Sequence, residues 1–452
     1  MNNPNGIRYG IWDLSPGVTA GHFKALLGAS YFAIGIMTLI GNLQPYLFST
    51  MFHLSSAEQG KLSGDLGSYN ELVFIVIAGF LGAASDKLGR RRIFAGGFLV
   101  MALAYVLYPL APDRGTLIVY RMIFAVGAAA VSSMLATVLA DYAIEKSRGK
   151  LVGIAFFCNG IGIASLIGLG TALPKLIQAS GASPEQTTRC AYWSVAALCL
   201  IPMLIVGFGL KPGVPAQLQK REPLLTTARI GLAAARDPRV ALGYLSALVS
   251  RGDLAIISTF FLLWLTRVGV ERGVDTASAF KHAGIFFVIA QVAATFWAAL
   301  AITLLDKFDR VAMLAIGMLL AAGSYLLVGF IDDPLGPGMY LASVLLGVGE
   351  MSGVLTSQSL IGQAASERGR GAVIGVYSAF GSLGILLATG VGGSLYASWR
   401  PSAPFVVVGA ADAVLAVIAL AVYLSTRRST RALAAGSMAG GSMAAHKSLE
   451  PR

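Results

Sequence analysis

Long apolar runs, separated by short polar segments, follow one another along almost the whole of this sequence. A helix that crosses the hydrocarbon core of a bilayer needs about 20 apolar residues, because each residue adds about 1.5 Å along the helix axis. Twelve runs come close to this length, and we therefore expect twelve transmembrane helices. The expected spans are residues 25–48, 60–84, 93–111, 116–140, 150–173, 191–210, 240–266, 281–304, 311–331, 339–363, 371–396 and 403–425.

The twelve runs fall into two groups of six. Between the groups, residues 211–239 are polar and rich in proline, lysine and arginine, which predicts a cytoplasmic interdomain linker. The pattern R-G-x-x-x-G occurs at 148–153 and again at 370–375, which indicates that one half duplicates the other. We therefore expect an all-α membrane protein with two pseudo-symmetric six-helix bundles, 22–210 and 240–428.

The two ends of the chain differ from the spans in composition. Residues 1–21 are polar and turn-rich, so we expect a short cytoplasmic segment followed by a first helix that is not cleaved off. Residues 429–452 are rich in Ala, Gly, Ser and Met, which predicts a disordered tail or an expression scar. Most of the 34 Lys and Arg residues fall in loops that share a side with the termini. This bias predicts that both termini are cytoplasmic, in a bacterial inner membrane or an equivalent plasma membrane.

Composition excludes several other classes of protein. The chain is 56% hydrophobic and 12% charged, with a mean hydropathy of +0.72, which excludes an ordinary soluble domain. Its net charge of +12 comes from short basic clusters without interleaved aromatic residues, so we expect no nucleic-acid partner. Three cysteines predict neither a disulfide framework nor a metal site. We also expect no cofactor and no enzymatic activity, because no phosphate loop or nucleophile triad is present.

The most specific motif is the loop between the second and third expected spans. Residues 82–92 read G-A-A-S-D-K-L-G-R-R-R. This loop, together with twelve spans and a central linker, resembles the major facilitator superfamily over residues 22–428. The proline-bearing motif that marks antiporters of this family in the fifth helix is missing from 153–170. The looser fourth-helix signature of the family, an arginine followed by small residues, matches Arg121.

The resemblance implies a conformational latch at the cytoplasmic end. The carboxylate of Asp86 would face the N-terminus of the eleventh helix, near Gly371, where the helix dipole favours a negative charge. Arg90 would then pair with an acid at the end of the fourth helix. A tight turn with cytoplasmic anchors explains the same residues without a latch. The proposed latch consists of Gly82, Asp86, Gly89, Arg90 and Asp141.

Ionisable residues inside the expected spans are candidates for handling solute or protons. An ionisable side chain at the bilayer centre costs about 2.5 to 3.5 kcal/mol on insertion scales, so each one suggests a function or a buried partner. Arg251 and Asp253 are about 200° apart around a helix and cannot pair along one face. Asp65 and Arg121 lie at similar depth, and an ion pair between them is the structural alternative. The candidates are Asp65, Glu71, Arg121, Arg251, Asp253 and Glu350.

In the superfamily that this chain resembles, helices 1, 4, 7 and 10 line a central cavity. That arrangement would place Arg121, Arg251 and Glu350 around one space. Arginines from both halves could hold an anionic group, because a guanidinium offers a fixed fork of donors. A carboxylate beside them could exchange a proton when the solute arrives.

We therefore expect an alternating-access transporter that carries a small anionic or zwitterionic solute in symport with protons. The expected partners are the solute, protons and membrane lipid, and the chain is expected to be a monomer. A proton-coupled exporter of amphipathic drugs or lysolipids is the alternative within transport. A transport-inactive sensor or scaffold with the same fold is the alternative from another class.

Overall fold

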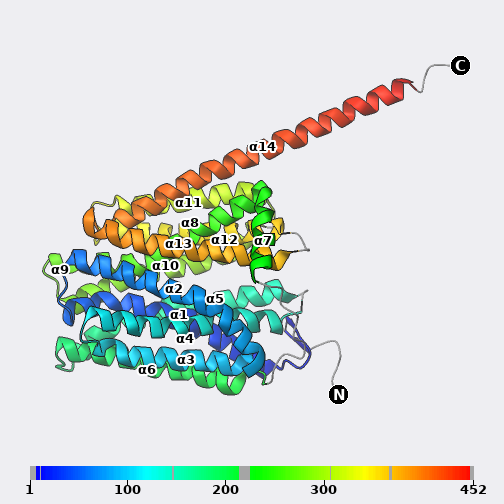
Figure 1. The fold of residues 1–452 in the computed structure, drawn as a ribbon. Helices are drawn as coiled ribbons and strands as arrows, with labels where there is room; N and C mark the ends of the chain where they lie inside the picture. Colours follow the sequence, from blue (N-terminus) through cyan, green and yellow to red (C-terminus); the bar gives the residue numbers. More distant parts are fainter. Residues whose placement is uncertain are drawn as a thin grey trace.

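Twelve long helices of the described chain form two bundles of six, which lie side by side (Figure 1). Within the described residues, eleven helices are long and apolar enough to cross a membrane when the continuous run Pro238–Glu271 is counted once. The helix α2, with 33 residues, is the twelfth long helix of the bundles and is not one of these eleven. The predicted fold class is therefore confirmed, and the chain is a multi-pass membrane protein. The computed structural model describes residues 7–10, 12–144, 147–212, 224–305, 307–365 and 369–447.

The N-terminal bundle holds the helices α1 to α6, and the C-terminal bundle holds α8 to α14. The elements of the first half are β1 Ile7–Tyr9, β2 Trp12–Leu14, α1 Ala20–Thr50, α2 Ser56–Leu88, α3 Arg90–Leu107, η1 Tyr108–Leu110, α4 Arg114–Tyr142, α5 Arg148–Gln178 and α6 Pro184–Gly209. Those of the linker and second half are α7 Leu224–Ala233, η3 Ala234–Arg236, α8 Pro238–Ile256, η4 Ile257–Phe261, α9 Leu262–Glu271, α10 Thr276–Leu305, α11 Arg310–Gly329, α12 Gly338–Ala364, α13 Arg370–Ser398 and α14 Ala403–Lys447.

Polar capping residues fix where several helices begin. Thr19 accepts a hydrogen bond from the backbone N–H of His22 at the start of α1. Ser183 does the same for Gln186 at the start of α6, and Asp113 caps α4. These caps satisfy N–H groups that have no partner within the helix. Because the capped turns are polar, helices such as α6 begin several residues before the apolar run that predicted them.

The two bundles meet through two pairs of helices. The helix α2 of the N-terminal bundle packs against α13, and α5 packs against α10 of the C-terminal bundle. In each pair, the second helix of one bundle meets the fifth helix of the other. The repeated R-G-x-x-x-G pattern begins at the first residue of α5 and of α13. The repeat in the sequence therefore corresponds to the pseudo-symmetry of the interface.

We call the end of the molecule that carries α7 the linker end, and the opposite end the far end. Small residues bring the bundles into close contact toward the far end. A Cβ atom on Gly64 of α2 would lie 2.5 Å from the carbonyl oxygen of Thr389 and 2.8 Å from Cα of Gly393, both in α13. A Cβ on Gly284 of α10 would lie 2.1 Å from Oγ1 of Thr171 in α5. At these positions, only glycine lets the helices approach so closely.

The same helix pairs are apart toward the linker end. A Cβ atom on Gly149 or Gly153 of α5 would meet no other atom within 4 Å. The same holds for Gly371 and Gly375 of α13. The structure therefore describes a conformation in which the bundles touch at the far end and separate toward the linker end.

The N-terminal segment departs from the purely helical expectation. The strands β1 and β2 form an antiparallel hairpin, in which Tyr9 pairs with Trp12. Leu14 is fully buried and bridges to Ala143, just after α4. A hairpin with strands this short is not stable alone. Burial of its apolar side chains against the bundle stabilises it.

The linker and the C-terminal tail also contain helix. The helix α7 lies within the expected linker, and Tyr244 of α8 donates a hydrogen bond of 2.7 Å to the carbonyl of Gly231 in α7. Residues 213–223 of the linker lie outside the described part of the chain. The helix α14 continues to Lys447 and projects away from the bundle (Figure 1), so helical backbone extends into the segment that was predicted to be a tail.

Candidate functional site: an ionic cavity between the bundles

A cavity of about 280 Å³ lies between the bundles, and three of the predicted ionic residues line it. Arg121 comes from α4 of the N-terminal bundle, whereas Arg251 and Glu350 come from α8 and α12 of the C-terminal bundle. Asn70 of α2 and Gln291 of α10 add uncharged polar groups. The helices α1, α4, α8 and α12, which are the first, fourth, seventh and tenth spans, all contribute to the wall.

Arg121 carries guanidinium N–H groups that no described protein group accepts. Its Nε and Nη1 atoms are buried and lack a hydrogen-bond partner among the described residues. The guanidinium is held in place by a hydrogen bond to Tyr108 and by the ring of Phe124, whose centroid lies 5.3 Å from Cζ. A buried donor without an acceptor costs about 1 to 3 kcal/mol. An anionic group that accepted these hydrogen bonds would remove this cost.

Arg251 is the corresponding cation of the C-terminal bundle. It belongs to none of the ion pairs formed by the described residues. Its side-chain stem packs on α13, where a Cβ on Gly381 would lie 2.9 Å from its Cγ. The nearby acid is Glu71 of α2, which is 5% exposed, hydrogen-bonds Ser382 of α13 and interacts electrostatically with Arg251. A carboxylate of one bundle therefore acts on a guanidinium of the other.

Glu350 is the acidic group of the cavity wall. Its side chain is 3% exposed, and its Oε2 atom accepts a hydrogen bond of 3.3 Å from Nε2 of Gln291. This contact joins α12 to α10 beside the cavity. The cavity wall thus combines two guanidinium groups with one carboxyl group, so its formal charge is positive when Glu350 is ionised and more positive when it is protonated.

Three predicted residues do not line this cavity, namely Glu71, Asp65 and Asp253. Asp65 is partly buried and forms no ion pair with Arg121 among the described residues, so the alternative of a structural Asp65–Arg121 pair is wrong. Asp253 is fully buried and lies against Asp412 of α14, with which it interacts directly. Asp412 was missed, although its position inside the expected span 403–425 was a sufficient signal.

A wide helical turn lies at the cavity wall in the seventh span. Residues Ile257–Phe261 form a π-helical segment between α8 and α9. Ile257, Ser258 and Thr259 of this segment line the cavity. Single π-turns inside α-helices are rare and often occur at functional sites.

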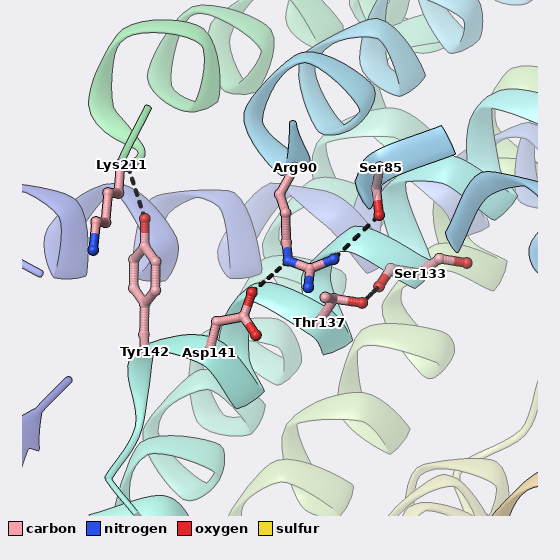
Figure 2. A network of polar contacts seen from close by, with 7 residues as sticks. All are labelled: Ser85, Arg90, Ser133, Thr137, Asp141, Tyr142 and Lys211. Atoms are coloured by element: carbon pink, nitrogen blue, oxygen red, sulfur yellow. Dashed lines mark hydrogen bonds and ion pairs between the residues drawn. The ribbon is translucent and has the colours of Figure 1, made fainter. Parts of the chain in front are cut away.

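The residues of the predicted latch lie at the linker end, and one of the contacts expected among them is present. Arg90 donates to the carboxylate of Asp141 and also to Ser85, from which it lies 3.1 Å (Figure 2). The expected pairing of Arg90 with Asp141 is therefore present, and it ties α3 to the end of α4. Gly89 joins α2 to α3 with φ 90°, a conformation that favours glycine. The side chain of Asp86 and the surroundings of Gly82 lie outside what the structure describes.

Two six-helix bundles that meet around a buried ionic cavity define a membrane transport protein. The sequence model of the Major Facilitator Superfamily matches residues 25–308 and 283–450. The chain belongs to this superfamily, as the loop motif suggested, and its members of known structure include transporters of small solutes.

Two relatives and one solved structure illustrate the similarity. The chain is 26% identical over 409 residues to the magnetosome protein MamH of Paramagnetospirillum magneticum, covering 88% of this chain and 91% of MamH. It is 27% identical over 387 residues to the magnetosome protein MamZ of the same organism, covering 81% of this chain but only 57% of MamZ. A point mutant of the nucleoside transporter NupG superimposes with a TM-score of 0.72 at 15% identity, covering 89% of this chain and 99% of NupG. At this identity, the superposition supports the fold alone.

Proposed function

We propose that this protein is an alternating-access secondary transporter that moves a small anionic or zwitterionic organic solute in symport with protons. One observation carries the proposal. The cavity between the bundles receives one guanidinium from each bundle, Arg121 and Arg251, and neither forms an ion pair with a described carboxylate. A solute carboxylate or phosphate group would bind both and thereby connect the two bundles.

The size and charge of the cavity favour a small anion. A volume of about 280 Å³ lies just below the range of about 300 to 1,000 Å³ that small-molecule sites occupy, so the solute should be small. Most of the remaining wall is apolar, including Ile34, Ile163 and Phe287, so an organic solute fits better than a bare inorganic ion. The names of MamH and MamZ refer to a cellular structure and to no solute, so the cavity is the basis of this assignment.

The packing of the interface supports alternating access. Glycine contacts close the far end, whereas the same helix pairs are open at the linker end, which is the geometry expected when the cavity faces one side of the membrane. Rotation of one bundle against the other would open the first set of contacts and close the second. The distribution of Lys and Arg supports a cytoplasmic linker end with both termini inside.

Glu350 is the proposed proton-coupling group of the cavity. It is almost fully buried, and among the described residues its carboxyl group accepts a hydrogen bond from the neutral amide of Gln291. A carboxyl group in such a place can hold or release a proton according to the charge that enters beside it. An anionic solute bound to Arg121 and Arg251 would favour the protonated form, so solute and proton would cross together.

The latch remains part of the proposal. The Arg90–Asp141 ion pair fixes the start of α3 against the end of α4, which positions the end of α2 and hence Asp86. The helix α13 begins at Arg370, so Asp86 would act on its N-terminus when the linker end closes. We propose that this contact stabilises the conformation opposite to the one described here.

The test is uptake into proteoliposomes of purified protein under an imposed proton gradient. A panel of organic acids, amino acids, sugars, lysolipids and cationic drugs is first screened by thermal shift at several pH values. We expect anionic or zwitterionic compounds to stabilise the protein and to accumulate only while the proton gradient exists. The variant Arg251→Gln should raise the KM for the solute by at least tenfold, since a hydrogen bond to a charged group contributes about 1.5 to 3 kcal/mol.

Arg267→Gln is the matched control, because Arg267 lies in the same span but pairs with Glu271 at the far end. It should leave the KM unchanged. Transport of cationic compounds with equal efficiency in the parent protein and in Arg251→Gln would contradict the assignment of the solute. Export of the solute against its gradient, driven by inward proton flow, would favour the exporter instead. Absence of movement for every compound that stabilises the protein would favour the sensor.

A further inference from the structure

Two aspartates from different helices meet inside the C-terminal bundle, away from the cavity. Asp253 of α8 and Asp412 of α14 are both 0% exposed. Their carboxyl groups lie beside each other and interact directly. We call this contact the aspartate pair. Two adjacent carboxyl groups in an apolar interior share a proton, because both cannot be ionised together.

A third buried group points to a ligand at the aspartate pair. Tyr325 of α11 is 0% exposed, and its hydroxyl lacks a hydrogen-bond partner among the described residues. It interacts electrostatically with Asp253, Asp412 and Glu350. Apart from their mutual contact, neither aspartate receives a hydrogen bond from a described donor. A buried tyrosine hydroxyl near the pair can donate to whichever carboxylate is ionised.

The charged groups around the pair are acids rather than bases. Those that act on Asp253 come from two neighbouring helices and are Asp412 of α14 and Glu350 of α12. Arg251, two residues earlier in α8, lines the cavity and therefore lies on another face of that helix. A site with this charge binds a cation. The described residues hold no group of three or more His, Cys, Asp or Glu side chains arranged for a metal ion. The smallest cation, the proton, fits this site.

Glu350 connects the pair to the cavity. It lines the cavity on one side and interacts electrostatically with Asp253 on the other. Neither Asp253 nor Asp412 lines the cavity itself. Hydronium in the cavity would give a proton to the Glu350 carboxylate and become water. The O–H bond of Glu350 would then break as the same proton bonds to a carboxylate oxygen of the pair, which restores the Glu350 carboxylate. The transfer changes no oxidation state and needs no other reactant.

We propose that Asp253 and Asp412 form a proton-binding site inside the C-terminal bundle and that this site exchanges its proton with the central cavity through Glu350. The inference rests on the proposed proton coupling and adds to it a second proton site, with Asp412 as a member. The seventh span would then carry Arg251, which binds the solute, on one face and Asp253 of the proton site on another. Binding of a solute to Arg251 would thus act on the same helix that holds the proton.

The test is infrared spectroscopy of the full-length protein in lipid, which detects the C=O stretch of protonated carboxyl groups without any solute. At neutral pH, the parent protein should have a protonated-carboxyl band that shifts slowly in D₂O. The double variant Asp253→Asn/Asp412→Asn should lose the component that belongs to the pair. Glu350→Gln should keep that component but slow its hydrogen exchange at least tenfold. Asp332→Asn, which removes an exposed acid, is the control and should change neither property.

Each outcome either supports or overturns the proposal. An unchanged band in the double variant would overturn the proton site. Loss of the band in the parent protein on addition of sodium would also overturn it, because the pair would then bind a metal cation. This sodium titration needs no variant and holds even if the double variant fails to fold. Transport that ignores the proton gradient, with the band behaving as expected, would refute the proposed symport but leave the proton site standing.

Discussion

The substitution Gly64→Ala should shift the protein toward the conformation in which the far end is open. In the structure, the added methyl group would lie 2.5 Å from the carbonyl oxygen of Thr389 and 2.8 Å from Cα of Gly393. Both are backbone atoms of α13, so no rotation of a side chain can relieve the contact. The two bundles must move apart at this point.

The size of the effect follows from this overlap. Forcing one extra carbon into a well-packed contact costs about 1 to 3 kcal/mol. This cost should fall only on the conformation with a closed far end, because rocking the bundles apart there would separate α2 from α13. A differential free energy of this size changes the ratio of two conformations by roughly 5-fold to 150-fold.

Gly375→Ala is a matched control in the same helix pair. Both substitutions replace a glycine inside a helix, and both gain about 1 kcal/mol of helix propensity. A Cβ on Gly375 meets nothing within 4 Å in the described conformation. The substitution Gly375→Ala should therefore leave the closed far end intact. The difference between the two variants isolates the steric contact at Gly64 from the change in helix propensity.

Pulsed electron paramagnetic resonance can measure the two populations. Spin labels at Lys61 of α2 and Ser398 of α13, both exposed at the far end, report the separation of the helices there. Gly64→Ala should enrich the longer distances, whereas Gly375→Ala should not enrich them. If the two variants gave the same distance distribution and the same transport rate, the far-end glycines would not control closure, and the argument for rocking between these helix pairs would be wrong.

Three further outcomes are expected. Glu350→Gln should abolish solute accumulation driven by a proton gradient but retain exchange of labelled for unlabelled solute, as measured in proteoliposomes. Asp141→Asn should lower the transport rate but change the free energy of unfolding by less than about 1 kcal/mol. The change in stability is small because the ion pair with Arg90 is partly exposed, and such pairs contribute little. A thermal melt of the purified protein measures this change in stability. Gly89→Ala should destabilise the protein by about 1 to 3 kcal/mol in the same melt, because alanine rarely adopts φ 90°.

Hydropathy predicted the number and order of the spans because a bilayer imposes its own length on every helix. It predicted the helix starts less well. Expected at 191 and 281, α6 and α10 begin at Pro184 and Thr276. Their first turns lie beyond the apolar run, where capping side chains satisfy the backbone. The pattern S-P-E-Q at 183–186 contains a capping box that could have corrected the first of these starts.

The sequence also located most of the buried ionic residues but did not assign them to a face. The spacing of Arg251 and Asp253 predicted that they point in different directions. It could not decide which of them meets the cavity, since that depends on how α8 rotates against α12 and α13. Asp412 lies within the last expected span, and its significance emerges only when α14 is placed beside α8.

The positions of the buried acids suggest how the two bundles divide the work. Among the described residues, the buried carboxyl groups are Glu71 in the N-terminal bundle and Asp253, Glu350 and Asp412 in the C-terminal bundle. The cavity arginines, in contrast, come one from each bundle. A proton held by the C-terminal bundle alone cannot by itself change the contacts between the bundles. A solute that binds both Arg121 and Arg251 can change these contacts. The same solute competes with Glu71 for the Arg251 guanidinium. We infer that the solute drives closure and that the proton determines whether the C-terminal bundle accepts the solute.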